Sequence, residues 1–131
     1  MESPKNKALS VYEQFQDLRV LLIGGTGFLG KVWLSLVLKH YPNVGHIYMI
    51  VRSRRRSDGS IRQSHEVRFW SEVATSPALD PLRKGRTAKE FNEFLNEKIT
   101  VFDGDVTRPF AGLTSDVRDE IRGKVDVLVN S

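Results

Sequence analysis

The sequence predicts an α/β fold, a parallel sheet wound in both directions with about four strands and helices on both faces. Short, β-rich apolar runs alternate with helical patterns along the chain. The first apolar run leads into a glycine-rich turn, and an apolar helical pattern follows that turn directly. Alternation of this kind is typical of βαβ units with right-handed crossovers.

Four segments are predicted strands: Arg19–Ile23, His46–Val51, Ile99–Asp105 and Val125–Asn130. The first is short, apolar and bounded by glycine, which favours a fully buried strand.

The helix after the glycine turn is expected to end near Tyr41, because Pro42 disfavours helical geometry in the residue before it. Its predicted inward face consists of Leu29, Val32, Trp33, Leu36, Val37 and His40, opposite Lys31, Ser35 and Lys39.

Further helical patterns lie between the second and third strands, around residues 67–74 and 91–95, and the latter opens with Thr87 and Glu90 at capping-box spacing. A short helix with Val117 and Ile121 inward is expected to stop at Gly123. We expect residues 1–14 to form a tail or short helix, and residues 15–131 to form one domain.

Composition excludes several classes of protein. The 131 residues are 40% hydrophobic and 27% charged, as in one globular domain. The longest apolar run, Phe28–Leu38, is interrupted by Lys31 and is too short for a bilayer crossing. Met1–Ser10 lacks the apolar core of a secretory signal. Without cysteine, and without ligand spacing among its three histidines, the chain is expected to be cytoplasmic and to have no metal site.

The glycine turn predicts a dinucleotide site. Gly25, Gly27 and Gly30 have G-x-G-x-x-G spacing, and Gly24 with the last two has G-x-x-G-x-x-G spacing. Glycines here permit a sharp strand-to-helix turn and close approach of a pyrophosphate to the helix N-terminus. Because the turn follows a buried strand and opens a helix, a Rossmann-like site is favoured.

Two other interpretations of the same glycines are open. Gly25, Gly30 and Lys31 also begin the P-loop pattern G-x-x-x-x-G-K-[ST], but Val32 has no hydroxyl to offer Mg²⁺. The third interpretation is a purely structural glycine turn.

The end of the second strand indicates which dinucleotide. An acidic residue there binds the ribose of NAD, whereas a basic residue accommodates the 2′-phosphate of NADP. The sequence has Arg52 at this place and no acid before Asp58, so NADP(H) is the expected cofactor. A solvated basic loop and nucleic-acid binding by Arg52–Arg56 are the other interpretations of this run. Asp105, just past the third strand, either contacts adenine or only caps a turn.

Several motifs occur in a family order: "GGTGFLGKVWL", "IYMIVR", "VFDGDVT" with "FAGLT", and "VDVLVNS". From about Phe15 onward the chain resembles the N-terminal part of a bacterial fatty acyl-CoA reductase. It is also similar to the reductase domains of carboxylic acid reductases and other thioester reductases, in the extended short-chain dehydrogenase/reductase superfamily. The resemblance implies an NADP-binding domain of a reductase that converts acyl-CoA to aldehyde or alcohol.

The resemblance also implies individual roles. It places Arg52 at the 2′-phosphate, with Arg68 as the preferred second arginine and Arg62 as the alternative. The residues it places at the cofactor's other groups are Gly24, Gly25, Thr26, Gly27, Phe28 and Leu29 at the pyrophosphate, Asp105 and Val106 at the adenine, and Asn130 with Ser131 beside the nicotinamide ribose.

The family's catalytic Tyr-x-x-x-Lys pair is expected to lie outside these 131 residues, because Tyr12, Tyr41 and Tyr48 are followed four positions later by residues other than lysine. We therefore expect a truncated chain with no catalytic residue of its own and an exposed edge on the fourth strand. Acyl-CoA is the expected substrate of the full-length parent protein, and no nucleic-acid partner is expected. A non-catalytic dinucleotide-sensing module and a nucleotide-sugar epimerase are the alternative functions.

Overall fold

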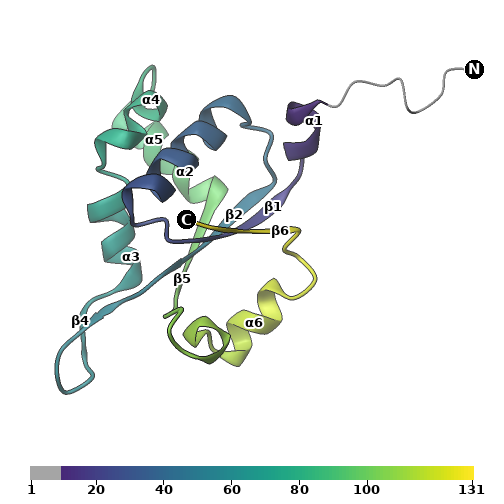
Figure 1. The fold of residues 1–131 in the computed structure, drawn as a ribbon. Coiled ribbons are helices and arrows are strands. Elements are labelled where there is room, and N and C mark those ends of the chain that lie inside the picture. Colours follow the sequence, from purple (N-terminus) through teal and green to yellow (C-terminus); the bar gives the residue numbers. More distant parts are fainter. Residues whose placement is uncertain (1–9) are drawn as a thin grey trace, which may run out of the picture.

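A computed structural model describes residues 10–131, which form a four-stranded parallel sheet with the order β5-β2-β1-β6 (Figure 1). The strands are β1 (Arg19–Ile23), β2 (His46–Val51), β5 (Ile99–Asp103) and β6 (Val127–Asn130). The predicted α/β fold is thereby confirmed. The third strand ends two residues earlier than expected, and the fourth begins two residues later.

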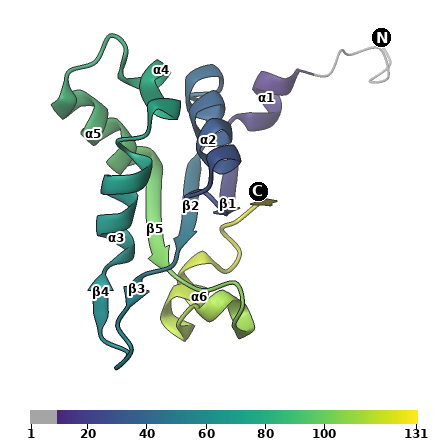
Figure 2. The ribbon, with the colours of Figure 1, turned by 60° about the vertical axis from the view of Figure 1, so that its left-hand side comes forward.

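The sheet is wound in both directions from β1. The chain first moves outward through β2 to β5, and then crosses back past β1 to β6. Because parallel crossovers are right-handed, the reversal puts the helices before β5 on one face and α6 (Ser115–Ile121) on the other. Figure 2 shows α6 set apart from the group formed by α2 to α5.

The main core lies between the sheet and the group of helices α2 to α5. Alternate side chains of neighbouring strands meet there, since Val20 is paired with Ile47 and Leu22 with Met49. All four are almost inaccessible to solvent. Apolar residues of α2 (Phe28–His40) and α5 (Ala88–Lys98) cover them and complete the core.

The predicted inward face of α2 was only partly right: Val37 is buried and Trp33 packs against the core, but Ser35, expected on the other face, is buried too. The buried residues of α2 are Gly30, Leu34, Ser35, Val37 and Leu38. Leu29 and Leu36, both expected inside, are 66% and 52% exposed, and His40 is exposed as well. Apolar side chains occupy most of this helix surface, so their periodicity fits more than one face. The helix does end where Pro42 predicts, with Tyr41 as its C-cap.

The link from β2 to β5 contains more structure than its sequence indicates. The arginine run enters a hairpin of β3 (Arg54–Arg55) and β4 (Ile61–Gln63), so it is not a plain solvated loop. The elements that follow are α3 (His65–Arg68), a π-helical turn (Phe69–Val73), a 3₁₀ turn (Pro77–Leu79), α4 (Asp80–Arg83) and α5. The predicted capping box of Thr87 and Glu90 is present.

Two further segments frame the sheet. Near the N-terminus, α1 (Val11–Phe15) is capped by Ser10, and the Phe15 ring stacks on Tyr41 at 4.5 Å. Residues 1–9 of the expected tail lie outside the described part. After β5, a 3₁₀ segment (Pro109–Gly112) precedes α6. Within residues 10–131, no helix is both long and apolar enough to span a bilayer.

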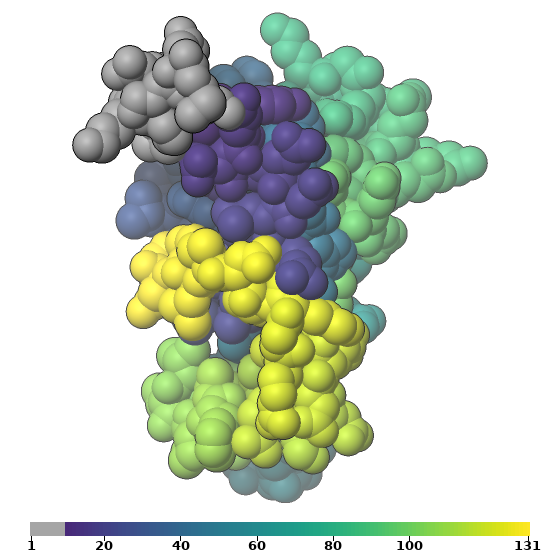
Figure 3. Space-filling model, turned by 90° about the vertical axis from the view of Figure 1, so that its right-hand side faces the viewer, coloured from purple at the N-terminus to yellow at the C-terminus, as the bar shows by residue number. Residues whose placement is uncertain are grey.

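The C-terminal segment lies against the first strand. Figure 3 shows yellow β6 beside the purple segment that contains β1. Ile23 is paired with Asn130. The backbone N–H of Arg19 also donates a hydrogen bond of 2.9 Å to Asp126 Oδ2, which fastens the start of both strands. β6 is an edge strand of the described sheet and Leu128 is 57% exposed.

Candidate functional site

The predicted site residues gather at one edge of the sheet. In a parallel sheet the carboxyl ends of all strands lie at the same edge, where ligands of open α/β sheets bind. Ile23 at the end of β1 is paired with Ile50, and Val51 at the end of β2 is paired with Asp103 of β5. The glycine turn, Arg52 and Asp105 therefore follow three strands that stop side by side.

The glycine turn leaves no room for side chains at its crossing points. Gly24 has φ +84°, in the left-handed region that favours glycine. A Cβ on Gly30 would lie 2.4 Å from the Gly24 carbonyl oxygen and 2.8 Å from Gly25 Cα. The first turn of α2 is thus packed directly against the strand-to-helix turn, so these glycines meet a packing requirement whatever they bind.

The start of α2 is suited to an anion. Its N-cap is Gly27, which has no side chain to cap the helix. The first N–H groups of a helix have no intrahelical acceptor, and they carry the positive end of the helix dipole. Phe28 and Leu29 are 79% and 66% exposed, and Thr26 is half-buried, so solvent reaches this turn. A phosphate is the ligand type that such a terminus accommodates.

The residues after β6 close one side of the glycine turn. Ser131 Oγ donates a hydrogen bond of 3.0 Å to the Gly24 carbonyl oxygen, and its backbone N–H donates one of 3.0 Å to the Ile23 carbonyl. Asn130 is exposed beside Ile23. The structure thus brings both predicted C-terminal residues to the glycine turn.

A hollow of about 480 Å³ lies beyond the ends of β2 and β5. Its lining residues are Arg52, Ser53, Arg54, Arg55, Arg62, Asp103, Gly104, Asp105, Arg108 and Gly112. Five arginines and two aspartates make this a polar, predominantly basic surface. Figure 2 shows the elements that surround it, the β3–β4 hairpin and the loop before α6, at the same end of the molecule.

The arginines of this hollow differ in what they contact. Arg54 Nη2 donates to Glu72 at 2.7 Å, and Arg55 Nη2 donates to Asp103 at 3.0 Å. The Arg52 side chain is 66% exposed, and its ion contact within residues 10–131 is a distant one, 4.0 Å to Asp105. Arg52 is therefore available to an incoming anion, whereas Arg54 and Arg55 are already paired.

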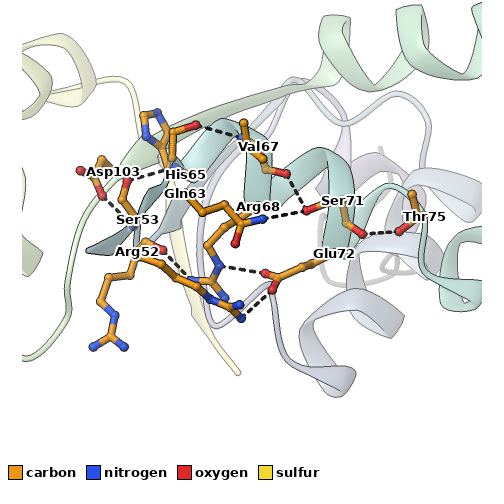
Figure 4. A network of polar contacts seen from close by, with 12 residues as sticks. Arg52, Ser53, Gln63, His65, Val67, Arg68, Ser71, Glu72, Thr75 and Asp103 are labelled. Carbon is orange, nitrogen blue, oxygen red and sulfur yellow. Dashed lines mark hydrogen bonds and ion pairs between the residues drawn. The ribbon is translucent and has the colours of Figure 1, made fainter. Parts of the chain in front are cut away.

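Arg68 does not line the hollow. Its Nε donates to Glu72 at 2.8 Å, and its Nη1 donates to the Arg52 carbonyl oxygen at 2.5 Å (Figure 4). The side chain is only 13% exposed. The structure thus brings Arg62 and Arg52 to the same hollow and places Arg68 behind the Arg52 backbone.

Asp105 is held by its own turn. Its Oδ1 accepts hydrogen bonds from the Thr107 backbone N–H at 3.0 Å and from the Thr107 hydroxyl at 2.6 Å. These bonds, with the nearby guanidinium groups of Arg52 and Arg108, lower the pKa of the Asp105 carboxyl below its ordinary value. The turn-capping interpretation is confirmed for Oδ1. Val106, next to it, is 58% exposed.

Arg108 was not found by sequence reasoning. It stands in a loop among polar residues, and a single arginine there carries no periodic or motif signal. Only the folded loop before α6 brings it to the hollow.

A second hollow, of about 690 Å³, is lined by residues that include Trp70, Arg83 and Phe91, and none of the predicted site residues lies there. Within the described residues no group of three or more histidine, aspartate or glutamate side chains is arranged to hold a metal ion.

Comparisons with known proteins show which family this chain belongs to. The model of an NAD-binding family described as male sterility protein matches residues 22–131. The chain is 30% identical over 122 residues to the alcohol-forming fatty acyl-CoA reductase of Simmondsia chinensis. The aligned segment covers 92% of this chain and 23% of that protein. The chain is 28% identical over 116 residues to fatty acyl-CoA reductase 8 of Arabidopsis thaliana, covering 88% and 22%. The chain therefore spans under a quarter of these relatives.

A solved structure shows the same fold. The reductase domain of a nonribosomal peptide synthetase from Mycobacterium tuberculosis superposes with a TM-score of 0.59 at 24% identity, over 86% of this chain and 23% of that one. Since the family model covers most of the chain, including the glycine turn and the basic hollow, the chain belongs to the NAD-binding family described as male sterility protein.

Proposed function

We propose that this chain is the NADPH-binding part of a fatty acyl-CoA reductase. Membership of an NAD-binding family supports a nicotinamide dinucleotide as the cofactor. The relatives named above support acyl-CoA as the substrate class. The observation that carries the choice of NADPH is Arg52. It follows β2 with its guanidinium exposed in the hollow, at the position where an NAD-binding site would have a carboxylate.

In this proposal the main-chain N–H groups at the start of α2 bind the pyrophosphate, since Gly27 leaves them uncapped. Arg52 binds the 2′-phosphate through a charge-assisted hydrogen bond. Asp105 and Val106 border the adenine. Arg68 holds the Arg52 backbone rather than the phosphate, because its guanidinium is already engaged by Glu72 and the Arg52 carbonyl.

The nicotinamide end of the cofactor would lie at Gly24, Asn130 and Ser131, where β1 and β6 stop together. When bound, the coenzyme would supply the hydride that reduces the thioester of the acyl-CoA substrate. The part played by this chain is to bind and orient the coenzyme beside the centre that the parent provides. It belongs to a reductase that forms fatty aldehyde or alcohol.

Calorimetric titration of the chain with NADPH, NADH and Mg-ATP in parallel tests the proposal. We expect NADPH to bind more tightly than NADH, and Mg-ATP to bind weakly, because Val32 offers Mg²⁺ no hydroxyl. Preference for NADH would contradict the role of Arg52. Tight binding of Mg-ATP would favour the P-loop interpretation of the same glycines.

A further inference from the structure

We propose that Arg108 is a second specificity-determining residue of the site, a direct contact of the phosphate monoester on the coenzyme ribose. This inference rests on the proposed NADPH function and deepens it. The ligand chemistry is a ribose 2′-phosphate, which carries a charge of about −1.5 to −2 at neutral pH.

Arg108 and Arg52 face the same carboxylate oxygen from different loops. Arg108 Nε lies 3.8 Å from Asp105 Oδ2, and Arg52 Nη1 lies 4.0 Å from that oxygen. Both distances are longer than a charge-assisted hydrogen bond, so neither guanidinium is saturated by Asp105. The two side chains are 72% and 66% exposed. They thus lie on either side of one place in the hollow, and their guanidinium N–H groups can donate hydrogen bonds to a ligand there.

The backbone that carries Arg108 is fixed. Its N–H donates to the Asp105 carbonyl at 3.0 Å, and its own carbonyl accepts from Ala111 at 3.1 Å. The Asp105 N–H in turn donates to the Ala111 carbonyl at 2.7 Å. Gly112 crosses close to this turn with φ +66°, where an added Cβ would lie 3.0 Å from the Asp105 nitrogen. Arg108 is therefore presented to the hollow by a closed, hydrogen-bonded loop.

The charges around the hollow favour a second guanidinium in contact with the phosphate. Arg54 and Arg55 are held by Glu72 and Asp103. A dianionic phosphate beside Arg52 alone would also lie near the ionised Asp105, which repels it. Arg108 offsets that repulsion, because it contacts the same aspartate and reaches the same hollow.

A guanidinium in this place has one other use, stacking on the adenine ring. The two roles differ in a measurable way. A stacking arginine stabilises every adenosine ligand, whereas a phosphate contact stabilises only the ligands with the 2′-phosphate. The geometry favours the phosphate, since Arg108 and Arg52 converge on one oxygen.

The test uses the whole chain and two fragments of the coenzymes, 2′,5′-ADP and 5′-AMP, titrated by calorimetry into the wild type and Arg108→Gln. Arg122→Gln is the matched control, because it removes one charge from an exposed side chain paired with Asp119 on α6. Circular dichroism confirms that each variant is folded; the backbone hydrogen bonds of residue 108 do not depend on its side chain.

We expect Arg108→Gln to weaken 2′,5′-ADP about tenfold, the effect of one charge-assisted hydrogen bond. Binding of 5′-AMP should stay unchanged, and the control should bind both ligands like the wild type. Equal weakening of both ligands, or no weakening of either, would overturn the assignment while leaving the proposed function intact. A wild-type chain that binds 2′,5′-ADP no better than 5′-AMP would instead contradict the proposed function itself.

Discussion

Arg68 donates a hydrogen bond of 2.5 Å to the carbonyl oxygen of Arg52, sixteen residues earlier in the chain. The same guanidinium donates to Glu72, which also accepts from Arg54. One carboxylate of the π-helical turn thus fixes two arginines, and through Arg68 it fixes the backbone at the end of β2 (Figure 4). The Arg52 side chain is left pointing away from this network.

Arg68→Lys should therefore disturb Arg52 without removing a charge. Lysine lacks the planar fork that reaches both acceptors at once. We expect the free energy of unfolding to fall by about 1 kcal/mol, and NADPH binding to weaken several-fold while NADH binding changes little. Urea unfolding and calorimetry measure the two effects, with Arg122→Lys as the control. Lower stability with an unchanged NADPH-to-NADH ratio would show that Arg68 only supports the fold.

Gly30→Ala tests the packing of the glycine turn. Its added Cβ would meet the Gly24 carbonyl at 2.4 Å, which forces backbone to shift. We expect a loss of about 1–3 kcal/mol in unfolding free energy, the usual range for overpacking.

Gly27→Ala is the matched comparison for Gly30→Ala. Gly27 has φ −78°, and its nearest neighbour for an added Cβ is 3.4 Å away. The change should cost less than about 1 kcal/mol, mainly from a poorer helix cap. Equal losses for the two variants in urea titrations would contradict the close crossing at Gly30.

The lowered pKa of Asp105 predicts a pH dependence. Its folded-state pKa lies below the unfolded value because the ionised form accepts two hydrogen bonds from Thr107 and lies near Arg52 and Arg108. Its stabilising contribution is therefore present above the ordinary aspartate pKa of about 3.9. It is lost as the pH falls below that value and through the folded-state pKa.

Thermal unfolding of Asp105→Asn from pH 2.5 to pH 7 measures this contribution. The difference in melting temperature from wild type should be largest near neutral pH and shrink toward the acid end. The carboxyl resonance of Asp105 should also titrate below its ordinary range in NMR spectra. A difference in melting temperature that does not change with pH would show that the carboxylate charge is immaterial to the turn.

The sequence predicted the parts of the molecule whose signals are local. The strand Arg19–Ile23, the glycine turn and the capping box of Thr87 are each encoded within a few neighbouring residues. The buried face of α2 was not predictable from periodicity, because Leu34 and Leu36 are equally apolar and only tertiary packing separates them.

The basic hollow could not be predicted from local sequence signals, for a different reason. Arg62 reaches it because β4 folds back against β3, and Arg108 because a loop closes after β5. Both are long-range consequences of the fold. Arg52 was predictable, since its position directly after the second strand defines its place at the sheet edge.

We propose that Arg52 selects the phosphorylated coenzyme, and the binding of NADPH and NADH to Arg52→Ala tests this role. Arg56→Ala is the control from the same run, because Arg56 donates to the Ile61 carbonyl within the hairpin. We predict that Arg52→Ala weakens NADPH at least tenfold and leaves NADH and the control nearly unchanged. Equal weakening of both coenzymes, or tighter binding of NADH by the wild type, would contradict this role of Arg52.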